Sequence, residues 1–174
     1  MYSHILATLD GSPLSEAILP QVEKLAAGTP LRVTLLAVAE DPTPISSTPT
    51  VYPERLIHAT GALKEATLQE MDVHREGETH EQAIQRVESE LKEYLQEHAA
   101  RLRQQGIDTV CEVAMGDPVQ VIVERARATG VDAIAMASHG RTGLAQLLFG
   151  SVAAQVIERA GLPVIVVRPD GLQR

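Results

Sequence analysis

Short apolar runs alternate with amphipathic segments along most of the chain, and each run has the length and β-branched or small-residue content of a buried strand. The apolar runs are residues 4–9, 32–39, 108–114, 132–137 and 164–167. Between them, apolar residues recur every three or four positions, which predicts helices. The helical segments are residues 13–27, 80–105, 118–130 and 151–160. Strands that alternate with helices are typical of α/β proteins, so we predict a three-layer α/β/α sandwich around a five-stranded parallel sheet with right-handed crossovers.

The middle of the chain departs from this alternation. Residues 40–53 contain four prolines together with Ser and Thr, which predicts an exposed loop. Residues 54–75 have a moderate helical pattern, and the sequence leaves open whether residues 54–105 form one kinked helix or two. We interpret the chain as a single domain, residues 1–174, with a loop and helix insertion at about residues 40–80.

Composition narrows the classes of partner. The formal net charge is −8, and the chain has no Trp, one Phe and three Tyr. A nucleic-acid interface needs basic patches and often aromatic stacking platforms, so we expect none here. The absence of a signal-peptide pattern and of an apolar run near membrane-spanning length predicts a cytoplasmic protein that does not bind membranes, and the single cysteine fits a reducing compartment.

Most of the candidate chemistry follows the strand at residues 132–137. A polar loop with two early glycines, starting at Ser138, comes next, and Gly150 and Ser151 then begin a helix. A loop that leads from a buried parallel strand into a helix N-terminus can bind an anion, because the first helical amides lack internal partners and carry about half a positive charge. Gly140 and Gly150 lack a Cβ and would let phosphate oxygens approach the main chain, while Arg141 would add donors. The same pattern also fits a loop in which the glycines only close turns, His139 is solvated and Ser151 is only a helix N-cap.

Asp10 ends the first strand and would lie on the same edge of a parallel sheet as this loop. Open α/β sheets bind ligands at that edge, so Asp10 is a candidate ligand residue. It could instead only stabilise the turn that precedes the first helix, where Ser12 is the expected N-cap and Pro13 the first helical residue.

These residues carry a family resemblance. The stretch Ala137-Ser138-His139-Gly140, followed after nine residues by Gly150-Ser151, resembles the nucleotide loop of the universal stress protein family. In its ATP-binding branch that loop reads glycine, two residues, glycine, nine residues, glycine and Ser or Thr. Ala137 replaces the first glycine and adds a methyl group near the expected ribose-phosphate path. The resemblance extends from residues 5–12 to residues 163–169.

The resemblance implies the Rossmann-like strand order 3-2-1-4-5 and a dimeric protein that binds ATP, with Mg²⁺ bound through the phosphates. It also implies a regulatory or stress-response role. The adenine would lie by Thr8, Asp10 and Val38, and the ribose near Met136 and Ala137. The phosphates would lie along the loop that contains Ser138, His139, Gly140 and Arg141, and along Gly150, Ser151 and Val152. The amides at Gly140 and Gly150 would enclose the ligand oxygens beside the Asp10 carboxylate.

The resemblance also implies a homodimer that pairs the last strand, residues 164–168, antiparallel with its own copy. That pairing would cover an apolar strand at a sheet edge. An alternative is a family member that binds AMP or no nucleotide and acts as a dimeric protein-interaction module, which Ala137 and the 40–80 insertion favour. We expect no enzyme beyond weak ATP hydrolysis, because His139 has no evident acid partner or nucleophile in the sequence and the histidines lack metal-ligand spacing.

Overall fold

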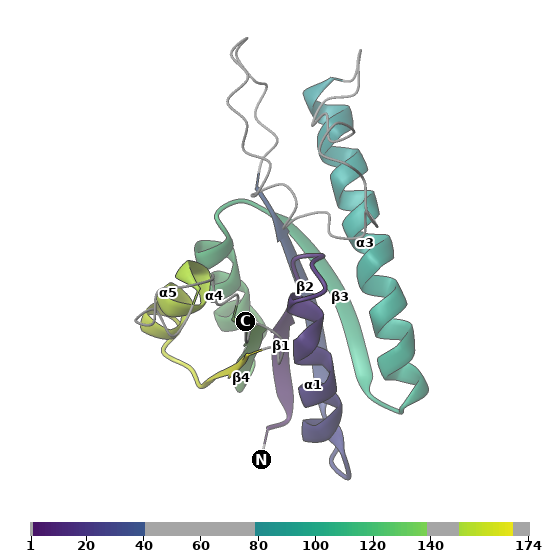
Figure 1. Cartoon of the computed structure of the whole chain (residues 1–174), viewed down its shortest axis with the longest axis vertical. Helices are drawn as coiled ribbons and strands as arrows, with labels where there is room; N and C mark the ends of the chain where they lie inside the picture. The colour runs from purple at the N-terminus through teal and green to yellow at the C-terminus, as the bar shows by residue number, and fades with distance from the viewer. Residues whose placement is uncertain (1, 41–78, 139–149, 169–174) are drawn as a thin grey trace, which may run out of the picture.

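The computed structural model describes residues 2–40, 79–138 and 150–168. Five parallel strands form one sheet in the order β3-β2-β1-β4-β5, as expected (Figure 1). The strands are β1 (His4–Thr8), β2 (Arg32–Ala39), β3 (Asp108–Met115), β4 (Ala133–Ala137) and β5 (Val164–Val167). The predicted sandwich and strand order are therefore confirmed.

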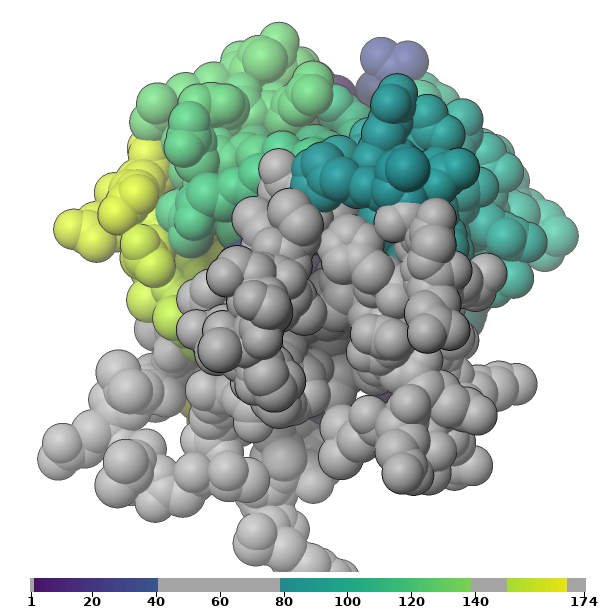
Figure 2. Space-filling model, turned by 90° about the horizontal axis from the view of Figure 1, so that it is seen from above, coloured from purple at the N-terminus to yellow at the C-terminus, as the bar shows by residue number. Residues whose placement is uncertain are grey.

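Helices cover both faces of the sheet. On one face lie the 3₁₀ helix η1 (Ser15–Ile18), α1 (Leu19–Ala26) and α3 (His80–Gln104), and on the other lie α4 (Pro118–Thr129) and α5 (Ser151–Arg159). Seen from above, α3 lies on one side of the molecule and α4 and α5 lie on the other (Figure 2). Successive residues of β1 alternate between the two cores: Ile5 and Ala7 pack with the α1 and α3 side, whereas Leu6 packs with the α4 and α5 side. Burial on both faces explains why the strand sequences are apolar without alternation.

The sheet opens between β1 and β4. Their pairing runs from Ile5 with Ala133 to Ala7 with Ala135, where it stops. On the outer sides, β1 stays paired with β2 as far as the Leu9 N–H, and β4 stays paired with β5 as far as the Ser138 N–H. The chain that leaves β1 connects to β2 on one side, and the chain that leaves β4 connects to β5 on the other side. The gap between the ends of β1 and β4 is therefore the topological switch point, where open α/β sheets bind ligands.

The first helix differs from the prediction. We expected one helix over residues 13–27, but the regular α-helix begins only at Leu19 and is preceded by the single 3₁₀ segment η1. Pro20 explains the difference, because it has no N–H to bond the carbonyl of Glu16 and its ring would clash with that carbonyl in a continuous α-helix. The Ser12 hydroxyl still accepts a hydrogen bond from the Ser15 N–H, at 3.1 Å.

The two ends of α4 agree with the expected signals. Asp117 caps α4 by accepting from the Gln120 N–H at 2.8 Å, and Gly130 ends that helix in the left-handed conformation. Thr79 and Gln82 form a capping box at the start of α3. Most of the 40–80 insertion predicted from the sequence, residues 41–78, lies outside the described residues.

Candidate functional site

Three of the predicted site residues, Asp10, Val38 and Ser138, lie at the carboxyl edge of the sheet. Thr8, the last residue of β1, pairs with Leu36; Asp10 follows β1 by two residues, and Val38 lies two residues further along β2. Ala7 is the last residue of β1 that pairs with β4, at Ala135, and Asp10 and Ser138 each follow three residues later, on the two sides of the switch point. The fold therefore brings Asp10 to the carboxyl edge beside the end of β4, as the sequence predicted.

Asp10 organises a buried turn. Its Oδ1 accepts hydrogen bonds from the Ser12 N–H at 2.9 Å and from the Ser12 hydroxyl at 2.6 Å. The Ser15 hydroxyl accepts from the Asp10 N–H at 3.2 Å and donates to the Ser12 carbonyl at 2.8 Å. Ser12 and Ser15 are both buried, so these bonds fix the direction in which the chain leaves β1. The turn-stabilising role of Asp10 is thus present, and it holds the carboxylate at the edge of the gap.

Ser138 and Gly150 join the end of β4 to the start of α5. Ser138 is 2% exposed, and its Oγ accepts a hydrogen bond from the Gly150 N–H at 3.3 Å. The amide of Gly150 was expected to contact phosphate, but here it is bonded to protein. The Ser138 hydroxyl was expected as a ligand donor; in this structure it is buried and accepts from the Gly150 amide.

The amides that follow Gly150 remain available at the start of α5. Gly150, not Ser151, is the N-cap residue, with φ −63° and ψ 159°, and none of the described side chains caps this helix. Ser151 is therefore the first helical residue rather than the cap. Helix geometry leaves the N–H groups of Ser151, Val152 and Ala153 without intrahelical acceptors, and the Ala154 N–H is the first to bond within the helix, to the Gly150 carbonyl. This uncapped helix end provides positive electrostatic potential.

The remaining predicted residues differ in burial. Met136 and Ala137 are buried on β4, with 4% and 8% exposed. Thr8 and Val38 are half-buried at the ends of β1 and β2. His139, Gly140 and Arg141 lie outside the described residues.

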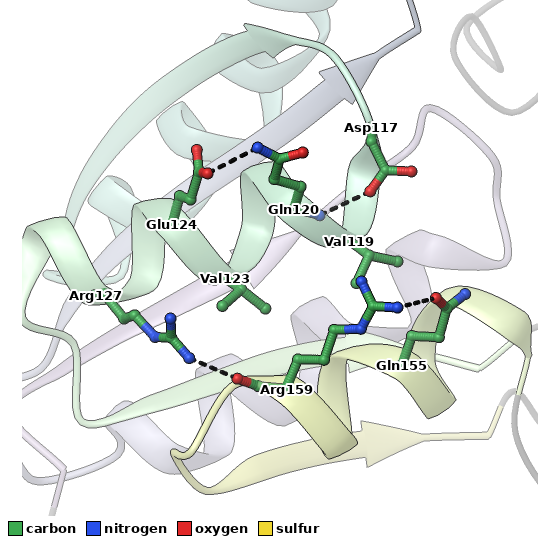
Figure 3. Close-up of a pocket in the computed structure, with 8 residues that line it drawn as sticks. All are labelled: Asp117, Val119, Gln120, Val123, Glu124, Arg127, Gln155 and Arg159. Atoms are coloured by element: carbon green, nitrogen blue, oxygen red, sulfur yellow. Dashed lines mark hydrogen bonds between the residues drawn. The ribbon is translucent and has the colours of Figure 1, made fainter.

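A groove of about 650 Å³ lies elsewhere, between α4 and α5 (Figure 3). Val119 and Val123 contribute its apolar part, and the Arg159 guanidinium donates to the Gln155 side-chain oxygen at 3.1 Å. Arg127 donates to the Arg159 carbonyl at 2.7 Å across the same groove. None of the predicted nucleotide residues lines it, so it is separate from the switch point.

One cluster beside the Asp10 turn was missed by sequence reasoning. Tyr94 of α3 is 7% exposed, and its hydroxyl donates to Glu16 Oε1 of η1 at 3.3 Å. The His98 ring meets the Tyr94 ring edge to face, and its Nε2 lies 3.6 Å from the same carboxylate oxygen. Burial and the Glu16 charge raise the pKa of Tyr94 well above its usual range, so the phenol stays protonated and donates. Glu16 and Tyr94 are 78 positions apart in the sequence, so their contact leaves no local signal. The sequence could have indicated only that Tyr94 lies on the buried face of α3, because it is spaced three or four positions from other buried residues of that helix.

The described part of the chain lacks both a metal-binding cluster and a membrane-spanning helix. No group of three or more His, Cys, Asp or Glu side chains gathers there as a metal site. No helix in those residues is both long and apolar enough to cross a membrane.

A model of the Universal stress protein family matches residues 1–168, which is nearly the whole chain. The chain belongs to the universal stress protein family. It is similar to the universal stress protein YxiE of Bacillus subtilis, with 28% identity over 97% of this chain and all of YxiE. It is also 36% identical to the universal stress protein MJ0577 of Methanocaldococcus jannaschii over a stretch that covers 49% of this chain and 58% of that relative.

Solved structures share the universal stress protein fold along the full length. The structure of MJ0577 superposes with a TM-score of 0.70 at 26% identity, covering 98% of this chain and 99% of that one. A universal stress protein in complex with cAMP has a TM-score of 0.56 at 20% identity and covers 96% of this chain and 97% of its own. A family protein from Arabidopsis thaliana with AMP bound has a TM-score of 0.56 at 15% identity, covering 98% of this chain and 94% of its own.

Proposed function

We propose that this universal stress protein is a cytoplasmic homodimer that binds ATP, with Mg²⁺ bound through the phosphates, at the gap between β1 and β4. Nucleotide occupancy then regulates a stress response. The observation that carries the proposal is the pair of features on opposite sides of the gap: the Asp10 turn at the end of β1 and the uncapped N-terminus of α5 after β4.

The residues present suit an adenylate. Phosphate oxygens need several donors and a positive potential, and the free amides of Ser151 and Val152 at a helix start provide both. Because Gly150 has no side chain, phosphate can approach these amides closely. The main chain at Val38 is available for the adenine edge, and Asp10 and Thr8 border the nucleoside. Adenylates are the ligands of the two solved family structures described above, one with cAMP and one with AMP, which supports the ligand class.

The conformation described here leaves a specific role for Ser138. Its bond to the Gly150 amide fixes the start of α5 against β4, so the phosphate would meet the amides from Ser151 onward rather than that of Gly150.

A second candidate is a family member that binds AMP or no nucleotide and acts as a dimeric interaction module. Ala137 in place of the first loop glycine favours it, because the extra methyl group lies near the ribose-phosphate path. In either case we expect binding and regulation rather than fast catalysis, with no more than slow ATP hydrolysis.

Isothermal titration calorimetry tests the proposal. The purified full chain is titrated with ATP in the presence of Mg²⁺, and separately with AMP and with GTP. We expect saturable binding of one ATP per chain and weaker binding of GTP, because main-chain groups at Val38 would read the adenine edge. Mass spectrometry of the supernatant after heat denaturation would identify any nucleotide that co-purifies. If titration with adenylates at millimolar concentration produces no heat of binding, nucleotide binding is rejected and the interaction module is favoured.

A further inference from the structure

Polar contacts connect α3 to the segment that follows β1 at two levels, one helical heptad apart. At the first level, Glu16 of η1 meets Tyr94 and His98. At the second level, Glu23 of α1 meets the Arg101 guanidinium at 3.3 Å and the Gln105 amide at 3.0 Å. The two sets of contacts are similar in kind, but only the first lies next to the Asp10 turn.

The first level is continuous with the turn through Ser15. Ser15 is 4% exposed and directly precedes Glu16, and its hydroxyl holds the Asp10 N–H and the Ser12 carbonyl. The pKa of Tyr94 reflects the same proximity: burial raises it most, and the nearby charges of Glu16 and Asp10 raise it further. A residue that fixes Glu16 therefore also restrains the backbone that carries Ser15 and the Asp10 carboxylate.

We propose that Tyr94 is a positioning residue, which holds η1 through Glu16 and thereby sets the Asp10 turn at the edge of the β1 and β4 gap. This inference rests on the proposed nucleotide function, and it adds α3 to the elements that determine affinity. The phenol suits this role because its ring packs in the core while its hydroxyl reaches a carboxylate on η1.

The variants separate this role from a general contribution to packing. Tyr94→Phe removes the hydroxyl and keeps the ring, and Glu16→Ala removes the acceptor. Glu16→Gln keeps a side-chain oxygen that can accept from Tyr94, so it should behave like the wild type. Glu23→Ala is the matched control, because it breaks the second set of polar contacts, between α1 and the end of α3, without touching the Asp10 turn.

Two measurements are made on the full chain. The first is hydrogen exchange of the amides in residues 10–16 without nucleotide, which does not depend on ligand binding. We expect faster exchange in Tyr94→Phe and Glu16→Ala and unchanged exchange in Glu16→Gln and Glu23→Ala. The second is the dissociation constant for ATP with Mg²⁺, which we expect to rise about two- to tenfold in the first two variants, the range of one hydrogen bond.

The outcomes distinguish the two claims. If the wild type binds no nucleotide, the proposed function fails, while exchange in residues 10–16 still decides whether Tyr94 holds the turn. If the wild type binds ATP but Tyr94→Phe shows native exchange and native affinity, the positioning role is wrong. Equal effects of Glu16→Ala and Glu23→Ala would also overturn it, since they would reflect helix packing alone.

Discussion

The Gly150 N–H donates a hydrogen bond to the buried Ser138 Oγ at 3.3 Å, which joins the two ends of the segment formed by residues 139–149. The Ser138 N–H in turn donates to the Val167 carbonyl at 2.8 Å, so the start of α5 is tied through Ser138 to the paired strands β4 and β5. In the proposed function, this contact fixes where the free amides of α5 lie relative to Asp10.

Ser138→Ala tests that contact. The substitution leaves the Gly150 N–H without its acceptor, and we expect the free energy of unfolding to fall by about 1 kcal/mol. ATP affinity should fall as well, because the amides of Ser151 and Val152 lose their fixed position. Urea denaturation and calorimetric titration measure the two effects. Native stability and native affinity in this variant would show that the contact has no role in solution.

Position 137 tests the departure from the family loop pattern. Ala137→Gly removes the methyl group near the expected ribose path, so ATP should bind more tightly, although a glycine in a strand should lower stability by about 0.5–1 kcal/mol. Ala137→Val adds bulk and should weaken binding. Titration of both variants, with unfolding curves to separate affinity from stability, checks the order Gly, Ala, Val. A tighter-binding Val variant would contradict the proposed path of the ligand.

The dimer prediction can be tested on β5 without breaking the sheet. The carbonyls of Pro163 and Val167 accept from β4, so by alternation the N–H and C=O groups of Val164 and Val166 face away from β4. Val166→Pro therefore removes an outward N–H and should leave a folded monomer, whereas Ile165→Pro should disrupt the pairing with β4 and destabilise the fold. Light scattering after size-exclusion chromatography gives the masses. A wild-type monomer at micromolar concentration, or a Val166→Pro dimer, would count against pairing through β5.

A carboxylate at the opposite edge of the sheet predicts a pH dependence. One oxygen of Asp132 accepts from the His4 N–H, the Ser3 hydroxyl and the Ser3 N–H. These bonds, led by the one from His4, lower the pKa of Asp132 from 3.8 to about 2. The unfolded chain therefore binds this proton more readily, so the stabilisation is complete above the unfolded pKa and is lost as the pH falls toward 2.

Asp132→Asn should flatten the stability profile in that acid window. Denaturant midpoints measured between neutral pH and about pH 2 follow the change. Asp108→Asn is the control, because the Asp108 carboxylate lies in an exposed ion pair with Arg32 and should contribute little. Parallel profiles for the wild type and Asp132→Asn would mean that the three hydrogen bonds do not persist in solution.

The fold was predictable because local signals and the global arrangement agree. Short apolar runs predicted the strands, which are buried on both faces, and Asp117 and Gly130 predicted the two ends of α4. The strand order came from the family resemblance, since periodicity does not select among doubly wound orders. The predicted start of the first helix, at residue 13, was wrong. The helical spacing of apolar residues indicated a continuous helix, but Pro20 lacks the N–H that such a helix would need, and a 3₁₀ segment forms before it.

The site was predictable only in part. The sequence placed Asp10 at the switch-point edge, because the ends of parallel strands meet there. It could not show that the Gly150 amide bonds Ser138, or that Glu16 bonds Tyr94, since these contacts depend on side-chain directions across different elements. The positions of His139, Gly140 and Arg141 in the site stay predictions.

Ser151→Pro tests whether main-chain amides at the start of α5 hold the phosphates. Proline is favoured at the first helical position, and Gly150 already has the extended conformation that precedes proline, so the helix should remain while one amide is lost. Ser151→Ala is the control that keeps the amide. Calorimetric titration with ATP and Mg²⁺ should show binding at least about tenfold weaker for Ser151→Pro and only slightly weaker for Ser151→Ala. Equal ATP affinity of a folded Ser151→Pro variant and the wild type would show that these amides do not hold the phosphates.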